Sequence, residues 1–160
     1  MFLCEVCIRQ RSRLSLDPVG PTLVHHQQIA TPAMTLENRY VTVQESGDVV
    51  ILSIGLARVK DFEVAEAIGK ALISAGLQKP APKVVVDLSQ LEYMSSVGYG
   101  PFLSLRAAIQ DAGGRLVLCG LSPVIKQLFE ATRLLINPHS PGSLFEFTDT
   151  VPAAVALLSA

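Results

Sequence analysis

The chain is poor in charge, cysteine and tryptophan, and these shortages exclude several classes of protein. Charged residues make up 17% of its 160 residues, where an average soluble domain has about 25%, and such sparse charge favours weak self-association. The net charge of −1 argues against direct nucleic-acid binding. No stretch reaches the roughly 18 to 20 uninterrupted apolar residues of a membrane span. We therefore expect one globular domain and no membrane span.

The three cysteines are not arranged as a disulfide framework or a metal site. A small, odd number of cysteines is typical of a cytoplasmic protein, and we expect that location. Cys4 and Cys7 have the spacing of a zinc or redox motif, with His25 and His26 as candidate ligands. A zinc finger needs histidines separated by about three to five residues, whereas these two are adjacent. Cys119 ends an apolar run and is interpreted as a buried core thiol.

The N-terminal segment, residues 1–36, lacks a sustained hydrophobic period and is predicted to be a flexible leader. It contains several prolines and a small cluster of arginines. Its apolar residues precede that basic cluster, which is the reverse of the order in a secretory signal. A more regular sequence begins at Met34, which suggests that the leader results from a wrongly assigned start codon. The folded domain is expected to occupy residues 37–160.

Hydrophobic periodicity predicts alternating strands and helices over the remaining chain. Strands are expected at 40–45, 49–54, 83–88, 115–119 and 144–147. Helices are expected at 62–73, 102–112, 123–129 and 150–158. Asp61 and Ser122 are candidate N-caps, and residues 55–60 are predicted to be a simple connection. This order predicts an α/β sandwich, with a mostly parallel sheet of about five strands, an N-terminal antiparallel hairpin and about four helices.

The segment 84–100 carries the most distinctive pattern and reads VVVDLSQLEYMSSVGYG. Its valine-rich strand, which should be covered on both faces, runs into a loop that ends in Ser95 and Ser96. A helix is predicted to follow, and the N–H groups and dipole at a helix start favour negative charge. A serine hydroxyl at that place can cap the helix, bind an anion or accept a phosphoryl group.

The order of elements and three local patterns resemble the STAS domain family, which includes bacterial anti-sigma factor antagonists and the cytoplasmic parts of sulfate transporters. The patterns are VVVDLS at 84–89, LEYMSSVGYG at 91–100 and GGRLVLCGLSP at 113–123. The resemblance covers roughly residues 41–158 and implies a single STAS-like sandwich. In this family the loop commonly reads Asp-Ser-Ser-Gly, and its first serine is phosphorylated.

The resemblance implies that Ser96 is the phosphoacceptor. The partner-binding loop that it implies contains Asp87, Ser95, Val97, Gly98 and Tyr99. Ser95 stands in place of the usual aspartate, and Val97 stands in place of the second serine. Arg58 ends a Gly-Leu-Ala-Arg stretch where the family has Gly-x-Leu-Asp.

The function that the resemblance implies is that of a cytoplasmic anti-sigma factor antagonist. Its partner would be an anti-sigma factor with serine kinase activity, and the ATP would belong to that kinase. No cofactor and no metal are therefore implied for this chain. The domain is expected to be a regulatory protein-binding module and not an enzyme.

Two other functions stay open. The domain could be a STAS adaptor that is never phosphorylated, in a stress-signalling scaffold or a transporter complex. It could instead be a small hydrolase or ligand-binding protein that uses Ser95 and Ser96. That alternative has little support, because His139 has no obvious carboxylate partner and no catalytic residue is identified.

Plain structural roles are also open for the polar residues of the loop. Asp87 is most simply a carboxylate that caps its own loop by accepting backbone N–H bonds. Ser96 could be a helix cap, but Pro101 would then lie inside the helix, where its missing N–H would remove one helical hydrogen bond. The cap is therefore expected at Val97 or Gly98, which leaves Ser96 just outside the helix.

Overall fold

A five-stranded sheet forms the centre of the described part of the chain. The computed structural model describes residues 39–135 and 144–160, all of which fall in the unit Pro32–Ala160. In spatial order the strands are β1 (Val41–Ser46), β2 (Val49–Ile54), β4 (Lys83–Asp87), β6 (Arg115–Cys119) and β7 (Glu146–Thr148). β1 and β2 form an antiparallel hairpin, and every other pairing is parallel.

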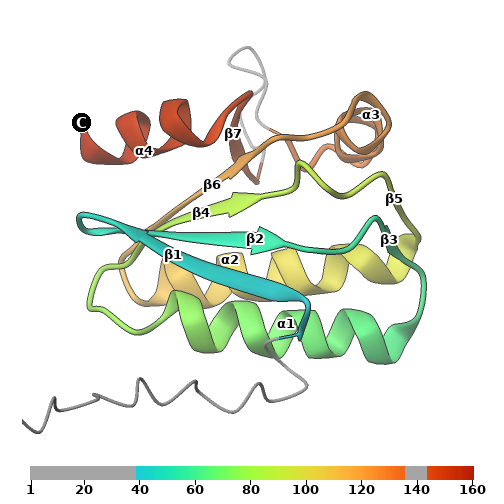
Figure 1. Cartoon of the computed structure of the whole chain (residues 1–160), viewed down its shortest axis with the longest axis horizontal. Coiled ribbons are helices and arrows are strands. Elements are labelled where there is room, and N and C mark those ends of the chain that lie inside the picture. The colour runs from blue at the N-terminus through green and yellow to red at the C-terminus, as the bar shows by residue number, and fades with distance from the viewer. Residues whose placement is uncertain (1–38, 136–143) are drawn as a thin grey trace, which may run out of the picture. The chain divides into compact units, whose positions relative to one another are not determined.

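Helices cover both faces of this sheet, as Figure 1 shows. α1 (Phe62–Gly76) and α2 (Tyr99–Asp111) lie on one face, and α4 (Val151–Ser159) lies on the other. α3 (Pro123–Ala131) lies beside the loop that follows β4. Within the described ranges, no helix combines the length and apolar character that crossing a membrane would require. The predicted fold class, order of elements and antiparallel hairpin are confirmed.

The central strand β4 explains why its sequence does not alternate between apolar and polar residues. Side chains of a strand point alternately to opposite faces. Val84 and Val86 therefore pack into the large core under α1 and α2, while Val85 packs into the smaller core under α4. All three are 0% exposed, so a strand covered on both faces needs valine at every one of these positions.

Phe129 of α3 joins the elements that surround the larger core. Its ring centroid lies 5.4 Å from that of Tyr99, and 6.0 Å from those of Phe102 and Phe145. The Tyr99 and Phe145 contacts are edge-to-face, which is a favoured arrangement for aromatic pairs. One buried ring thus links α3 to the start of α2 and to the stretch that enters β7.

Two polar residues were predicted to be N-caps, and only one of them makes the expected side-chain bond. As predicted, the Ser122 hydroxyl accepts a hydrogen bond from the Ile125 N–H, at 3.4 Å. Pro123 occupies the first turn of the helix. Asp61 occupies the N-cap position of α1 but makes no side-chain capping bond. The predicted strand at 144–147 is shifted, because β7 covers Glu146–Thr148 while Phe145 only bridges Leu135.

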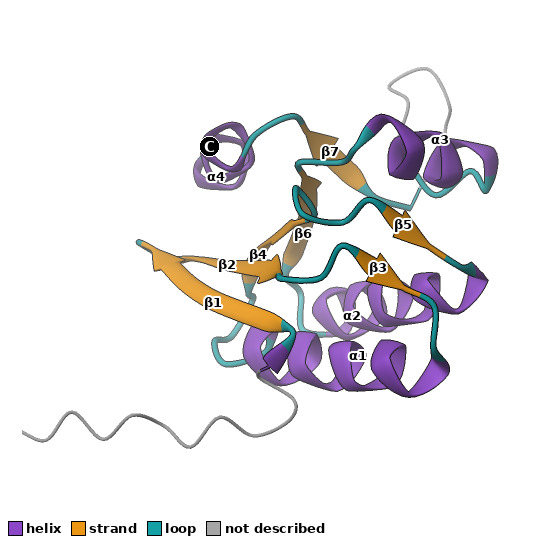
Figure 2. Cartoon of the chain, turned by 45° about the vertical axis from the view of Figure 1, so that its right-hand side comes forward, coloured by secondary structure: helices purple, strands orange, loops and turns teal. Residues whose placement is uncertain are grey.

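The prediction that residues 55–60 form a simple connection was wrong. β3 (Arg58–Val59) pairs in parallel with β5 (Tyr93–Met94) as a second, two-stranded sheet. Figure 2 shows these strands side by side, with β5 toward α3. Strands of two residues are too short to give a periodic signal, so the sequence pattern could not indicate them.

Cys119 is a buried core thiol, as predicted. It is 0% exposed and packs in the cluster between the sheet and α4. Burial, together with a smaller effect of the nearby Asp87 carboxylate, raises the pKa of this thiol from its ordinary 9.0 to about 12. Because the folded pKa lies above the unfolded one, the neutral thiol favours the fold below about pH 9, and this contribution is lost as the pH rises toward about 12.

We expect Phe129→Ala to lower the free energy of unfolding by about 3–5 kcal/mol, because the substitution opens a cavity among three packed rings. Urea unfolding followed by circular dichroism measures this loss. Val124→Ala is the control, because Val124 lies on the same helix and is 54% exposed. The control should change stability by less than about 0.5 kcal/mol. An equal loss in both variants would contradict the role given to Phe129.

We expect the Cys119 thiol to resist iodoacetamide at about pH 8, because a buried neutral thiol is a poor nucleophile. Mass mapping of the peptide that contains Cys119 measures its alkylation over time. In urea the same peptide should be alkylated rapidly, which provides the internal control. Rapid alkylation of the native protein would show that this thiol is accessible, contrary to the packing described.

Candidate functional site

The loop between β4 and α2 is held by backbone hydrogen bonds at both ends. At its start, the Leu88 N–H donates to the Cys119 carbonyl at 2.9 Å. Further along, the N–H groups of Glu92 and Tyr93 both donate to the Ala57 carbonyl, at 2.9 Å and 3.0 Å. These bonds leave the loop little freedom to move away from the connection between β2 and α1.

Ser95 and Ser96 have different environments although they are neighbours. Ser95 is half-buried, its N–H donates to the Val59 carbonyl at 2.9 Å, and its hydroxyl donates to the Lys60 carbonyl at 3.2 Å. Ser96 is exposed, and its hydroxyl has no hydrogen-bond partner among the described residues. Of the two hydroxyls, the one that a second protein could reach is therefore that of Ser96.

Ser96 lies outside the α-helix, as expected. It begins a single 3-10 turn (Ser96–Gly98), and α2 begins at Tyr99 with Gly98 in the N-cap position. Pro101 then falls in the first turn of α2, where its missing N–H removes no helical bond. A Cβ on Gly98 would lie 2.8 Å from the Met94 Cβ, so this close approach requires glycine.

Asp87 holds the loop from the other side. Its Oδ1 accepts from the Ser89 N–H at 3.0 Å, and its Oδ2 accepts from the Ser53 hydroxyl at 3.4 Å. The interpretation of Asp87 as a carboxylate that caps its own loop is confirmed. A Cβ on Gly120 would come within 2.8 Å of Asp87 Oδ1, so the glycine also leaves room for this carboxylate.

Val97 and Tyr99 are half-buried, and their apolar parts pack against the larger core. Val97 also borders an open groove of about 230 Å³ between α1 and α2. The groove is lined by Phe62, Ala65, Glu66, Gly69, Ile73, Val97, Gly100, Pro101 and Ser104. The Phe62 side chain at one end of the groove is 70% exposed, which is unusual for an aromatic residue. An apolar, partly open surface thus adjoins the exposed serine.

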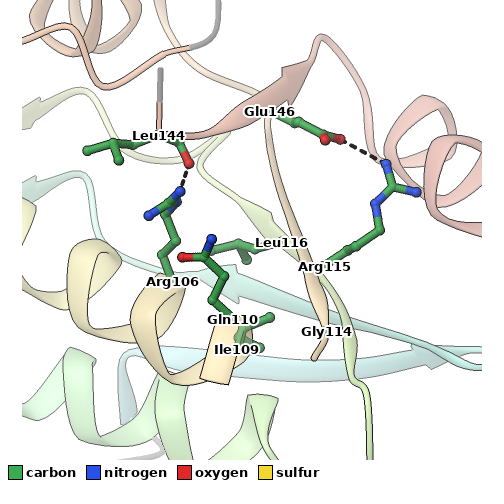
Figure 3. A pocket seen from close by; sticks show the side chains of 8 residues that line it. All are labelled: Arg106, Ile109, Gln110, Gly114, Arg115, Leu116, Leu144 and Glu146. Carbon is green, nitrogen blue, oxygen red and sulfur yellow. Dashed lines mark hydrogen bonds and ion pairs between the residues drawn. The ribbon is translucent and has the colours of Figure 1, made fainter. Parts of the chain in front are cut away.

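A second recess, of about 170 Å³, lies beside the start of β6 and the last turns of α2. Figure 3 shows Arg106 and Gln110 on one side, and the pair formed by Arg115 and Glu146 on the other. Arg106 Nε donates to the Leu144 carbonyl, and Arg115 lies 3.0 Å from the Glu146 carboxylate. This recess lies beside the first residues of β6, whereas Ser96 lies in the loop that follows the end of β4, and no serine lines the recess. It therefore lends no support to a hydrolase that would use the loop serines.

Several candidate residues fall outside the described residues. Cys4, Cys7, His25, His26 and His139 all lie there, so the zinc and histidine interpretations stay untested. Among the residues that the structure does describe, no cluster of three or more histidine, cysteine or acidic side chains could hold a metal ion.

Sequence reasoning identified Ser95 and Ser96 but missed what positions them. The missing feature is the β3–β5 ladder, in which Val59 pairs with Met94 and the Lys60 carbonyl holds Ser95. One signal was available, because Val59 is a single apolar residue between the charged residues Arg58 and Lys60. Such a short alternation predicts little unless its partner strand is known.

Known proteins resemble this chain in sequence and in fold. The family model described as "STAS domain" matches residues 40–150. A Bordetella bronchiseptica protein named "Putative anti-sigma factor antagonist BtrV" is 32% identical over 87 residues, which cover 54% of this chain and 69% of that protein.

Two solved structures illustrate the likeness of fold. An anti-sigma-factor antagonist (STAS) domain protein from Planctomyces limnophilus has a TM-score of 0.65 at 20% identity, covering 75% of this chain and 98% of that chain. SpoIIAA of Bacillus in its phosphorylated form has a TM-score of 0.51 at 17% identity, covering 73% and 97%. At these identities the comparison concerns the fold alone. Since the family model spans nearly all of the described residues, this chain belongs to the STAS domain family.

Proposed function

We propose that this protein is an anti-sigma factor antagonist that is switched by phosphorylation of Ser96. Its partner would be an anti-sigma factor with serine kinase activity, and both would work in the cytoplasm. One observation carries the proposal. The Ser96 hydroxyl is exposed and has no bond to the described residues, while the loop around it is held by backbone bonds. The name of the Bordetella relative supports the same class of partner.

A phosphate on Ser96 should leave the fold intact. Phosphorylation adds about −1.5 to −2 charges at neutral pH. Ser96 precedes the first turn of α2, where the helix dipole favours negative charge. Because the hydroxyl is exposed and bonds to none of the described residues, the modification removes no hydrogen bond that the structure describes. Its effect would therefore fall on a bound partner, through steric block and charge.

The surface around Ser96 suits a protein partner. Phe62 and Tyr93 are exposed aromatic side chains, and Val97 continues this surface into the groove between α1 and α2. Aromatic residues in the core of an interface often supply most of the binding energy. In this proposal Asp87, Ser95 and Gly98 hold the loop in shape, whereas Val97 and the exposed edge of Tyr99 contact the partner. The ATP belongs to the kinase, so this chain needs no cofactor.

We expect Ser96→Ala to abolish phosphorylation and to retain the anti-sigma factor, because no phosphate can then block the contact. Ser96→Glu should weaken binding by at least about tenfold, which corresponds to about 1.4 kcal/mol. Intact-mass analysis of protein from its native host measures the phosphate, and calorimetry with the purified anti-sigma factor measures affinity.

Ser95→Ala is the matched control for this experiment. Its hydroxyl bonds to the Lys60 carbonyl, so the variant should lose about 1 kcal/mol of stability and still be phosphorylated. If the protein is never phosphorylated, and if neither Ser96 substitution changes the affinity for its partners, the result would instead indicate a STAS adaptor. A phosphate on Ser95 would contradict the assignment of Ser96.

We expect Gly100→Leu to weaken partner binding by about tenfold or more, because the added side chain fills the groove beside Ser96. A Cβ on Gly100 meets no atom within 4 Å, so the variant should fold. Replacing glycine in a helix should even raise stability by up to about 1 kcal/mol. Calorimetry with the anti-sigma factor measures the affinity.

The control is Ala156→Leu, which adds bulk to an exposed position of α4 on the other face of the sheet. It should leave the affinity unchanged. If Gly100→Leu binds like the unchanged protein, the groove is not part of the interface, and the proposed contact must be limited to the loop.

A further inference from the structure

The outward face of the small β3–β5 sheet carries two cations and an aromatic ring. Side chains alternate along a strand, and the register pairs Arg58 with Tyr93 and Val59 with Met94. Val59 and Met94 are each 3% exposed, so they face the core. Arg58, Lys60 and Tyr93 are exposed and therefore face solvent. We call these three residues the basic sheet face.

The basic sheet face is continuous with the phosphoacceptor loop. The Lys60 carbonyl accepts the Ser95 hydroxyl at 3.2 Å, and the Val59 carbonyl accepts the Ser95 N–H at 2.9 Å. The Lys60 ammonium lies 5.7 Å from the centroid of the Tyr93 ring, within the range of a cation–π contact. Ser96 is the next residue after Ser95, so the segment that carries Arg58 and Lys60 adjoins the loop that contains the proposed phosphoacceptor.

The two cations of this face form no ion pair with the described residues. Neither Arg58 nor Lys60 has a carboxylate within the 4.0 Å of an ion pair, whereas Lys79 and Lys83 do. Asp61, Glu63 and Glu92 are exposed nearby, but none of them pairs with these two cations. Arg58 also reverses the charge at the position where the resemblance led us to expect an aspartate.

We propose that the basic sheet face binds an acidic surface of the partner, and that a phosphate on Ser96 cancels this attraction. This inference rests on the proposed function and adds the charge of the surface that is recognised. Opposite charges across an interface attract and orient the partners. A phosphate beside Lys60 would draw the cations toward itself, and it would repel the carboxylates of the partner. Both effects favour release, which is the direction that the switch requires.

The first test uses a peptide of about twelve glutamates as the probe, so it needs neither the kinase nor the sigma factor. We expect the peptide to shift the amide NMR signals of 58–60 and 93–96, and an oligolysine peptide of equal length to leave them unchanged. The shifts should shrink in Ser96→Glu and disappear in the double variant Arg58→Gln/Lys60→Gln. The peptide should also bind more weakly as salt rises from about 50 to about 300 mM, because salt screens exposed charges.

The second test measures the affinity of the purified anti-sigma factor for a charge-reversed face. The double variant Arg58→Glu/Lys60→Glu should bind about 100-fold more weakly than the unchanged protein, because repulsion replaces attraction. Lys79→Glu is the matched control, since Lys79 lies in the loop between α1 and the start of β4, whereas Ser96 follows the end of β4. The pair of Lys79 with Glu45 is half-exposed. The control should change the affinity less than twofold, by about 0.4 kcal/mol at most.

The outcomes separate this inference from the proposed function. The inference would be overturned if the peptide shifts the same NMR signals in Arg58→Gln/Lys60→Gln as in the unchanged protein, or if the shifts extend to Arg133 and Arg115. This holds even if Ser96 is phosphorylated and controls the partner. The proposed function would fail instead if Ser96 is never phosphorylated while the peptide still binds at Arg58 and Lys60. Thermal unfolding of each variant confirms that a lost shift does not result from a lost fold.

Discussion

The position of Ser96 depends on a few backbone hydrogen bonds between two short segments far apart in the sequence. The carbonyl groups of Ala57, Val59 and Lys60 accept bonds from the stretch that leads into Ser96. Backbone groups withdrawn from water need partners, so this pairing is the stable arrangement for both segments. In this arrangement the Ser95 hydroxyl donates to the Lys60 carbonyl, whereas the Ser96 side chain is exposed to solvent. The same pairing brings the segment that carries Arg58 and Lys60 next to the loop of the proposed phosphoacceptor.

The layered core makes this arrangement rigid. β4 is buried on both faces, so the strand that leads into the loop has little freedom to shift. Glycines allow close approaches at two points, Gly98 against Met94 and Gly120 against Asp87. Phe129 then ties the start of α2 to α3 and to the chain before β7. A phosphate added to such a support changes the surface charge more readily than it changes the shape, which is what a switch acting on a partner requires.

Much of the fold could be predicted because its elements are long enough to repeat. The helical spacing of apolar residues in α1 reflects burial of one face, and the unbroken valines of β4 reflect burial of both faces. Each pattern lies within one segment, so each element could be predicted from its own sequence. The family resemblance added the prediction that Ser96 is the phosphoacceptor, because the motif that carries this prediction lies within one loop. The short strands β3 and β5 could not be found in this way, since two residues hold no period. The Asp61 side chain likewise shows that a residue suited to a cap need not make the capping bond.

The sequence by itself determined the α/β order, the antiparallel hairpin, the buried Cys119 and the loop that carries two serines. These follow from hydrophobic burial and local backbone preference, which act within a few turns of chain. Only the tertiary structure decided which of the two serine hydroxyls has no partner among the described residues, because the Ser95 hydroxyl bonds to the carbonyl of Lys60, 35 residues away. It also decided that Arg58, Lys60 and Tyr93 share one surface. Long-range strand pairing sets both results, and no single segment contains that information.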